Sequence, residues 1–485
     1  MRRRRPAVIP LLVALLLTGC SAGPGYVAPA SSLPGAFMGA AAVAARPGAA
    51  DAVDMLRWWR SFQDPMLTEL VEQALAQNLD LEQARARVLQ ARASLQGATA
   101  ELLPSGQVTG QVGRTYQSLE TPIGRVAGAF PQFERTTNLY EFDLGASWEI
   151  DLFGGRQAAR DAARAELQSS AAGAVAARLT VAAQTADTYI VVRALQGRLD
   201  VARAQLAKQE QLVALVRLQF SRGLAAELQL RQAEGALAQV GAAVPALGND
   251  LDIALNALDV LVGRQPGTLR PRLAPAAPIP RAPAISAADG PAEMLRRRPD
   301  IIAAERMLAA SNARIGVAIA EYYPKFTLSG LLGTATTSAA GLLSGNATQA
   351  NVLLGLRWRL FDFVRVDAEI QAAKGRDAEL LAAYRLAVLR ASQDVENAFS
   401  TLVNQEARST VLSQGETSLT RARDSALTAY RSGGVSLIEV LDADRRLLET
   451  RDAALQARAA ASRGAVMSFK ALGGGWDAAD ARFSR

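Results

Sequence analysis

The chain of 485 residues contains no histidine and only one cysteine, Cys20. Without histidine it lacks the side chain that most often serves as a general base or a metal ligand. A single cysteine near the N-terminus excludes disulfides, cysteine-based zinc sites and a thiol nucleophile inside the fold. These absences argue against an enzyme. We therefore expect no catalytic residues, no metal site and no cofactor.

The chain also lacks a strong excess of one charge. Its formal net charge of +7 includes four arginines at positions 2–5. Without these four, 49 basic residues face 46 acidic ones, so the sequence predicts no nucleic-acid-binding surface. Half of the residues are hydrophobic, which is ample material for a core.

The N-terminus has the pattern of a secreted, lipid-anchored protein. The four arginines precede an apolar stretch, residues 8–17, which is shorter than the roughly 20 residues of a spanning helix. It ends in Leu17-Thr18-Gly19-Cys20, which resembles a bacterial lipobox and makes Cys20 the expected acylation site. Attached acyl chains anchor a protein by burying methylenes at ~0.8 kcal/mol each. An ordinary signal peptide with an incidental cysteine is the alternative.

Four stretches alternate between apolar and polar residues, as strands with one face in lipid do. The clearest covers residues 139–150, where the apolar face carries Tyr140, Phe142, Leu144, Ala146, Trp148 and Ile150. A transmembrane strand needs about 9–11 residues of this pattern. We predict strands at about 105–117, 139–152, 325–335 and 350–363. A soluble sheet is the alternative.

Long segments without proline predict helices. No proline occurs at positions 132–244 or 325–485. Within the first segment a heptad seam recurs with one polar interruption, at Leu195, Leu199, Ala202, Leu206, Gln209, Val213, Val216 and Phe220. A continuous helix over 156–222 would be roughly 100 Å long. We expect helical hairpins at 155–262 and 365–472, with tips near Gly223 and Gly433.

The two halves of the chain repeat one another. Residues 220–234 match residues 430–444 at an offset of 210 positions, and residues 78–81 match residues 298–301 at an offset of 220. The second β-hairpin is therefore ten residues shorter than the first. The resulting division of the chain is a signal peptide (1–19), an extended acylated strap (20–57), repeat 1 (58–264), a proline-rich linker (265–291), repeat 2 (292–472) and a C-terminal tail (473–485).

Two repeats supply four strands, which cannot close a barrel. Strands whose outer face meets lipid cannot leave their edges unpaired. The pattern therefore requires several copies, and three copies would supply twelve strands. The predicted fold is an α/β membrane protein of two tandem repeats, each with a two-strand transmembrane β-hairpin and a long coiled-coil helical hairpin.

These features together resemble the TolC-like outer-membrane factor family, and within it the OprM-like or NodT-like lipoprotein branch of efflux channels. The resemblance runs from Cys20 to about Leu472. It is carried by residues 17–20, 58–59, 78–81, 148–154, 223–224, 298–301, 304–305, 315–318 and 433–442. No single motif in this set would suffice alone.

The resemblance implies a homotrimer with a twelve-strand β-barrel in the outer membrane and an α-barrel in the periplasm. Its tips would close the channel at rest and bind a periplasmic adaptor, which links them to an inner-membrane pump, best interpreted as proton-driven. The channel itself would be passive and would pass drugs or other small toxic solutes. In this branch a serine after the cysteine, here Ser21, implies transport to the outer membrane. The acyl chains on Cys20 would anchor the protein in that membrane.

The resemblance also assigns roles to residues at the two tips. Tyr430, Glu439 and Asp442 match constriction positions, and Glu439 and Asp442 would form acidic rings in a trimer. Gln229 stands where relatives often have Asp, so the first tip is expected to contribute less to such a gate. The positions matching adaptor-contacting turns are Arg222, Gly223, Leu224, Ala225, Ser432, Gly433, Gly434 and Val435. A merely solvated helix face and a simple turn are the alternatives.

Trp148 and Trp358 stand at the strand ends nearest the helices, where aromatic residues of a membrane interface are expected. Ordinary packing is the alternative for both. Two other functions remain open for the whole chain: a lipid-anchored periplasmic coiled-coil scaffold without a pore, and the outer-membrane component of a protein secretion system. We expect the second tip to move during gating and the first to support it.

Overall fold

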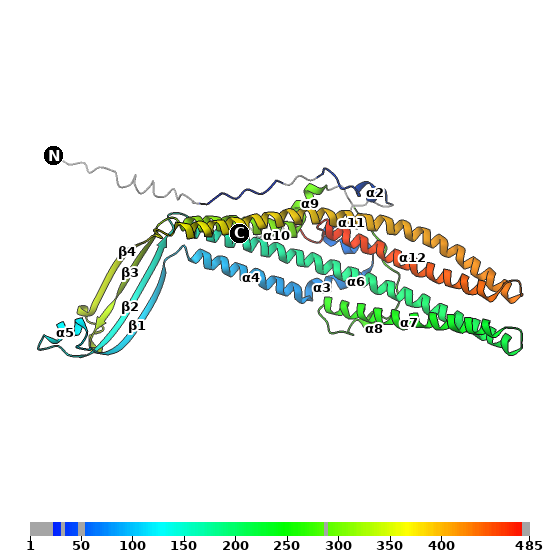
Figure 1. Cartoon of the computed structure of the whole chain (residues 1–485), viewed down its shortest axis with the longest axis horizontal. Helices are drawn as coiled ribbons and strands as arrows, with labels where there is room; N and C mark the ends of the chain where they lie inside the picture. Colours follow the sequence, from blue (N-terminus) through cyan, green and yellow to red (C-terminus); the bar gives the residue numbers. More distant parts are fainter. Residues whose placement is uncertain (1–22, 31–33, 47–53, 286–289, 478–485) are drawn as a thin grey trace. The chain divides into compact units, whose positions relative to one another are not determined.

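A computed structural model describes residues 23–30, 34–46, 54–285 and 290–477. Its elements are mainly long helices, together with four strands (Figure 1). Within these residues no helix combines the length and the apolar character needed to cross a membrane. Cys20, the expected acylation site, lies outside the described residues.

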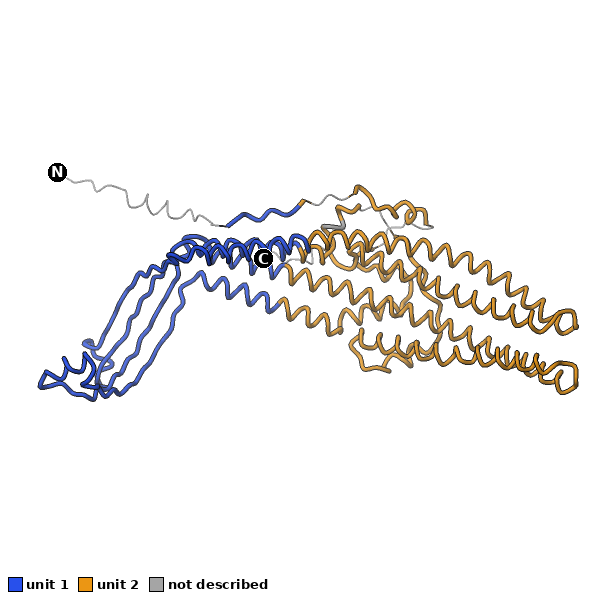
Figure 2. Tube along the Cα trace, in the orientation of Figure 1, with its two compact units in different colours: residues 1–29, 89–168, 305–383 blue, residues 30–88, 169–304, 384–485 orange. Residues whose placement is uncertain are grey.

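The chain forms two compact units (Figure 2). The first comprises the described parts of residues 1–29, 89–168 and 305–383, and the second those of residues 30–88, 169–304 and 384–485. Each unit takes matching parts of both sequence repeats. The units therefore differ from the repeats, because each repeat contributes strands to one unit and a hairpin tip to the other.

The first unit holds one antiparallel sheet in the order β1-β2-β3-β4. Its strands are β1 (Ser105–Tyr116), β2 (Thr136–Ile150), β3 (Lys325–Thr336) and β4 (Thr348–Arg357). The register pairs Leu144 with both Val108 and Leu332, so apolar side chains line up across neighbouring strands. The outer edges of β1 and β4 have no partner within the described sheet.

Two strand ends differ from the expected positions by three residues or more. β2 begins at Thr136, three residues earlier than expected, and β4 ends at Arg357 rather than near residue 363. The end of β4 follows from β3. Arg357 pairs with Lys325, the first residue of β3, and the residue before it is Pro324, which has no N–H to continue a ladder. Phe361 then has a φ of 63°, which ends any extended run.

The polar loop between β1 and β2 contains a short helix, α5 (Pro122–Gly128), which was not predicted from the sequence. Thr121 caps this helix, because its hydroxyl oxygen accepts a hydrogen bond from the Gly124 N–H at 3.1 Å. The composition of this segment does not predict a helix, because Gly124 and Gly128 are poor helix formers. Two 3₁₀ turns, η2 (Ala339–Gly341) and η3 (Gly345–Ala347), stand at the corresponding place between β3 and β4.

Part of the N-terminal strap packs on a helix of the first unit. The Tyr26 hydroxyl hydrogen bonds to the Glu305 carboxylate, and the Arg306 guanidinium lies 5.8 Å from the centre of the Tyr26 ring. Both partners belong to α10 (Pro299–Ala320). Gly23 approaches the backbone so closely that a Cβ there would lie 2.7 Å from the Gly316 Cα. The strap is therefore seated on α10 by specific contacts.

The long helices meet their turns in the second unit. The first helical hairpin is formed by α6 (Gly155–Ser221) and α7 (Glu227–Leu261), and the second by α11 (Phe363–Arg431) and α12 (Leu437–Ala471). The other elements are α2 (Ala40–Ala44), η1 (Met55–Phe62), α3 (Pro65–Gln77), α4 (Leu79–Ala100), α8 (Arg270–Leu273) and α9 (Pro291–Arg297). The proline-rich linker thus contains α8, which the sequence did not predict.

Aromatic packing and the heptad seam form the core of the second unit. The Trp58 ring stacks on Phe469 with centroids 5.4 Å apart, which joins η1 to α12. Along α6 the seam residues Leu195, Leu199, Ala202, Gln209, Val213 and Val216 are buried. The last seam position, Phe220, is 41% exposed because α6 ends one residue later and the chain turns.

Candidate functional site: the two hairpin tips

The two tips have the same backbone. Gly223 and Gly433 adopt left-handed φ values of 73° and 78°, which non-glycine residues rarely tolerate. In the first tip the Leu224 N–H donates to the Gln219 carbonyl at 2.8 Å, and in the second the Gly434 N–H donates to the Ala429 carbonyl at 2.8 Å. These bonds satisfy the last carbonyls of α6 and α11 in the Schellman pattern. The repeat seen in sequence is therefore also a repeat of turn geometry.

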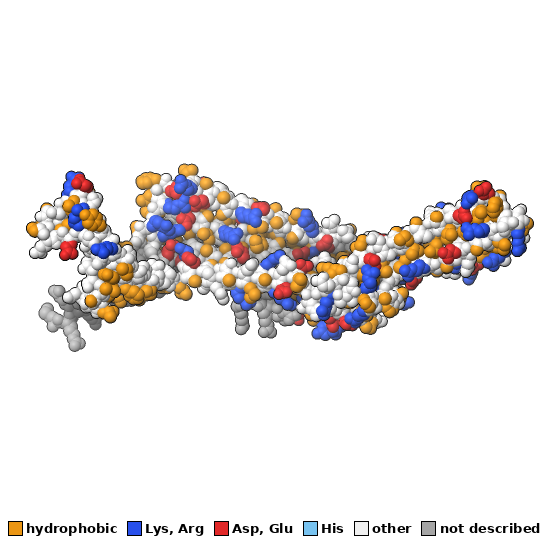
Figure 3. Space-filling view, turned by 90° about the horizontal axis from the view of Figure 1, so that it is seen from below, with side chains coloured by type: hydrophobic (Ala, Val, Ile, Leu, Met, Phe, Trp, Pro, Cys, Tyr) orange, Lys and Arg blue, Asp and Glu red, His pale blue; other side chains and the backbone are white. Residues whose placement is uncertain are grey.

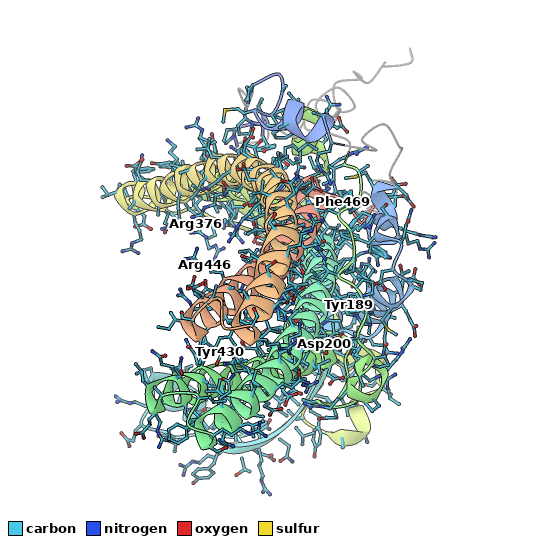
Figure 4. The ribbon with its side chains drawn as sticks, turned by 90° about the vertical axis from the view of Figure 1, so that its right-hand side faces the viewer. Tyr189, Asp200, Arg376, Tyr430, Arg446 and Phe469 are labelled. Atoms are coloured by element: carbon cyan, nitrogen blue, oxygen red, sulfur yellow. The ribbon has the colours of Figure 1, made fainter. Side chains whose placement is uncertain are left out.

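Within the second unit an apolar cluster joins one tip to the other. Its buried members are Leu212, Val213 and Val216 of α6, Leu230 and Ala233 of α7, Tyr430 of α11, and Leu437 and Val440 of α12. Figure 4 labels Tyr430 where the second hairpin meets the first. All four helices of the two hairpins contribute, so the tips of one chain are held together by burial of apolar surface.

Tyr430 adds a polar contact to this cluster. Its side chain is only 9% exposed, and its hydroxyl donates to the Gln219 Oε1 at 2.7 Å. Burial raises the pKa of the Tyr430 hydroxyl, so the group is a neutral hydrogen-bond donor at neutral pH. One side chain thus links α11 to α6 through both packing and a hydrogen bond.

The aromatic residue of the first tip has different surroundings. Phe220, which aligns with Tyr430, is 41% exposed. Two leucines near it, Leu224 and Leu228, are 76% and 65% exposed. On the face seen in Figure 3, hydrophobic, basic and acidic side chains lie together at the tips. The first tip therefore presents apolar side chains to its surroundings, whereas the second tip turns its aromatic residue inward.

The two predicted acidic gate residues also differ from each other. Glu439 is exposed in the first turn of α12. The Asp442 carboxylate accepts a hydrogen bond from Arg445 Nη2 and forms an ion pair with Arg446 Nε, each at 2.7 Å. The Arg445 hydrogen bond, aided by the charge of Arg446, lowers the pKa of the Asp442 carboxyl. Asp442 is therefore ionised at neutral pH, with its charge largely balanced by two arginines.

Sequence reasoning missed both arginines. They lie three and four positions after Asp442, the spacing at which side chains meet on a helix, so the signal was available. Figure 4 labels Arg446 on a different side of the second hairpin from Tyr430. Any ring formed at this level would contain both signs of charge rather than carboxylates alone.

The eight residues expected to contact an adaptor lie at the turns. Arg222, Gly223, Leu224, Ser432, Gly433 and Gly434 are exposed, whereas Ala225 and Val435 are half-buried. Val435 packs against the apolar cluster between the tips. The six exposed positions are accessible to a partner, and the other two belong to the fold of the tip.

Trp148 and Trp358 make the same contact in the two repeats. The Trp148 indole N–H donates to the Leu102 carbonyl at 3.0 Å, and the Trp358 indole N–H donates to the Tyr322 carbonyl at 3.0 Å. Leu102 and Tyr322 follow the ends of α4 and α10. Each tryptophan thus fixes the end of a strand segment to the end of a helix, a structural role of the kind that was the alternative to a membrane-interface position. Trp358 is nevertheless 47% exposed.

One face of the sheet is apolar and exposed. The exposed apolar side chains on it include Val108, Leu144, Leu332, Val352, Leu354 and Leu356. On the other face the Gln349 amide donates to the Asp143 carboxylate at 2.9 Å. A contiguous apolar surface of this kind is uncommon on a water-exposed protein and typical of a binding or membrane surface.

No group of three or more acidic, cysteine or histidine side chains able to hold a metal occurs in the part of the chain that the structure describes. The contacts described at the tips are hydrogen bonds, ion pairs and apolar packing.

Comparisons with known proteins agree with this architecture. The family model "Outer membrane efflux protein" matches residues 70–264 and 290–474. The pyoverdine export outer membrane protein OpmQ of Pseudomonas aeruginosa is 33% identical over 95% of each chain. Nodulation protein T of Rhizobium leguminosarum bv. trifolii is 30% identical over 90% of each chain.

A solved structure extends the likeness to three dimensions. The outer-membrane channel OprN matches with a TM-score of 0.83 and 31% identity, covering 94% of this chain and all of that one. The family resemblance inferred from the sequence is thereby confirmed. The chain belongs to the outer membrane efflux protein family.

Proposed function

We propose that the protein is the outer-membrane exit duct of a tripartite efflux system. It conducts drugs or other small toxic solutes passively from a periplasmic adaptor and an inner-membrane pump to the exterior. The observation that carries this proposal is an exposed apolar sheet face, joined by unbroken helices to two matched tips. Membership of the efflux family supports the same function.

The sheet supports a trimeric barrel. The apolar face suits lipid, but β1 and β4 each leave one edge without a partner in the described sheet. Unpaired backbone groups cost several kcal/mol each in lipid, so β1 must pair with β4 of a neighbouring copy. Twelve strands from three copies form a closed barrel, and the helices of the same copies form an α-barrel in the periplasm.

The tips support a gate. Tyr430 holds the second hairpin against the first through the apolar cluster and the bond to Gln219. In a trimer, Glu439 and Asp442 would line a constriction, where Arg445 and Arg446 would balance part of the negative charge. The constriction is therefore of mixed charge, and its closure depends more on packing than on acidic rings.

The exposed turn residues support binding of the adaptor, led by Leu224 of the first tip, and the exposed Leu228 at the start of α7 extends this apolar surface. The pump is assigned as proton-driven from the branch of the family that the chain resembles. The sequence ending in Cys20 supports acylation there, with the seated strap joining the lipid to the body. OpmQ is named for export of pyoverdine, which favours small organic cargo in this chain too.

The test uses the full-length protein purified from outer membranes. Light scattering measures its mass, and planar bilayers measure its conductance. A trimer that forms channels supports the duct. A monomer without conductance, released from membranes when Cys20→Ser blocks acylation, would instead identify a lipid-anchored scaffold.

A further inference from the structure

A layer of buried polar side chains lies next to the apolar cluster between the two hairpins. Gln205 and Gln209 of α6 are 5% and 2% exposed. The side chains of Asp444 on α12 and Arg423 on α11 are 11% and 12% exposed. Asp444 lies one helical turn beyond Val440, a member of the cluster. Three helices from both hairpins thus contribute polar groups to one buried layer.

The layer is incompletely paired. Asp444 Oδ1 and Arg423 Nε are 3.7 Å apart, and neither atom has a hydrogen-bond partner in the described structure, although Arg423 Nε also lies 3.3 Å from Asp424 Oδ1. The Gln209 Nε2 is likewise buried without a partner there. Buried polar atoms normally find partners, and an unpaired one costs about 1–3 kcal/mol. The contact between the hairpins therefore leaves the Asp444 carboxylate buried and only partly hydrogen-bonded.

The charges around Asp444 act in opposite directions. Burial favours its neutral form most strongly, and Asp424 of α11 adds to that effect. A hydrogen bond from Gln205 of α6 favours the ionised form, and so do the charges of Arg423 of α11 and Lys208 of α6. Burial prevails and raises the pKa of the Asp444 carboxyl. The charge of Arg451 contributes to the lowered pKa of Lys208, and Arg451 itself forms an ion pair with Glu416 at 3.0 Å.

We propose that Asp444 is a proton-binding site that sets how tightly the second hairpin is held against the first. The proposal rests on the gating function proposed above and adds a ligand, the proton, that regulates the gate. Protonation removes an incompletely paired buried charge, so the packed arrangement is favoured. Ionisation favours an arrangement in which the carboxylate reaches water.

The sign follows from linkage. The pKa of the Asp444 carboxyl is higher in the packed state than in water, so the packed state binds more protons between the two values. Packing therefore strengthens as pH falls through that window, which begins near the ordinary value of 3.8 and extends upward. Each unit of raised pKa corresponds to about a tenfold change in the packing equilibrium. An acidified periplasm would tighten the gate.

The repeat provides a matched control residue. Glu234 aligns with Asp444 but is paired with Arg217 at 2.9 Å and Arg231 at 3.0 Å. The Arg217 hydrogen bond is the main cause that lowers the pKa of the Glu234 carboxyl. Its surroundings therefore favour the ionised form of Glu234, whereas those of Asp444 favour the neutral form. Glu234→Gln removes the same charge as Asp444→Asn from the corresponding position without touching the buried layer.

The experiment measures hydrogen exchange of backbone amides at residues 437–447 between pH 4 and 8, corrected for intrinsic exchange rates. It uses the full-length protein and the variants Asp444→Asn, Glu234→Gln and Arg423→Gln. Single-channel conductance over the same pH range gives the second readout. Exchange requires no pore, so failure of the duct hypothesis and failure of this inference are distinguishable.

In the unmodified protein, protection should rise about tenfold per unit of raised pKa as pH falls, and conductance should fall with it. Asp444→Asn should stay protected and poorly conducting at every pH, whereas Glu234→Gln should follow the unmodified protein. Arg423→Gln removes a cation that favours ionisation, so the midpoint should move to higher pH. A pH profile retained in Asp444→Asn, or lost equally in Glu234→Gln, would overturn the proposal. An unmoved midpoint in Arg423→Gln would overturn it as well.

Discussion

The hydrogen bond between Tyr430 and Gln219 gives a quantitative prediction for the gate. Tyr430→Phe keeps the ring in the apolar cluster and removes only the hydroxyl, which donates to Gln219 Oε1 at 2.7 Å. A buried bond between neutral groups contributes about 1 kcal/mol. One tip should therefore open roughly fivefold more often, at 1.4 kcal/mol for each factor of ten. In the proposed trimer, three tips that open together would lose about 3 kcal/mol, or roughly 150-fold in the closed population.

The assay is the open probability of single channels in planar bilayers for Tyr430→Phe, Gln219→Ala and the double variant. A direct bond makes the two changes non-additive, so the double variant should open little more than either single one. Phe220→Leu is the control, because Phe220 occupies the matching position but is 41% exposed. Additive effects, or an equal effect of Phe220→Leu, would refute the assignment of Tyr430 as the residue that holds the gate.

Three further predictions concern the constriction, the turn and the lipid face. Glu439→Ala combined with Asp442→Ala should raise single-channel conductance or antibiotic leak. It should also shift ion preference toward anions, since Arg445 and Arg446 both lose the Asp442 carboxylate. Unchanged conductance and selectivity in bilayers would contradict the proposed constriction. Gly433→Ala should lower the free energy of unfolding measured in urea by about 1 kcal/mol, because alanine does not readily adopt the φ of 78° at this position. Gly434→Ala is the control and should be nearly neutral, because its added Cβ would lie 3.5 Å from the Ala429 carbonyl oxygen. Val352→Asp should lower the yield of membrane-inserted protein, because a charge facing lipid is unfavourable, while Asn351→Asp on the other face should not; equal insertion of both variants would argue against a lipid-facing surface.

Much of the fold could be predicted because its signals are periodic and local. Alternation along residues 139–150 located β2 to within three residues, and the absence of proline located the long hairpins. The glycine at each tip marked the turn, since only a left-handed φ closes it there. The loop helix α5 escaped prediction because its glycines favour irregular structure, and Thr121 supplies the missing signal only as a cap.

The site was less predictable because its properties depend on partners distant in sequence. Nothing in the local sequence distinguishes Asp444 from other helical carboxylates. Its surroundings arise only when the packing of the two hairpins brings Gln205 and Arg423 beside it. The difference between Phe220 and Tyr430 has the same origin. Both align in the repeat, yet only Tyr430 has a neighbouring hairpin on its side of the helix. The arginines beside Asp442 are the exception, since their spacing was local and readable.

The apolar cluster limits how the second tip can open. Full separation would expose Tyr430, Leu437 and Val440, and burying one such side chain stabilises a fold by about 2 kcal/mol. A cost of roughly 6 kcal/mol per tip would leave full separation very rare without a partner. Leu224 and Leu228 are 76% and 65% exposed, so a partner could bind them. Such binding would offset the free energy of opening only if the partner binds the open state more tightly than the closed state. Opening therefore requires either a sliding motion that keeps the cluster packed or a partner whose binding to the first tip is coupled to movement of the second.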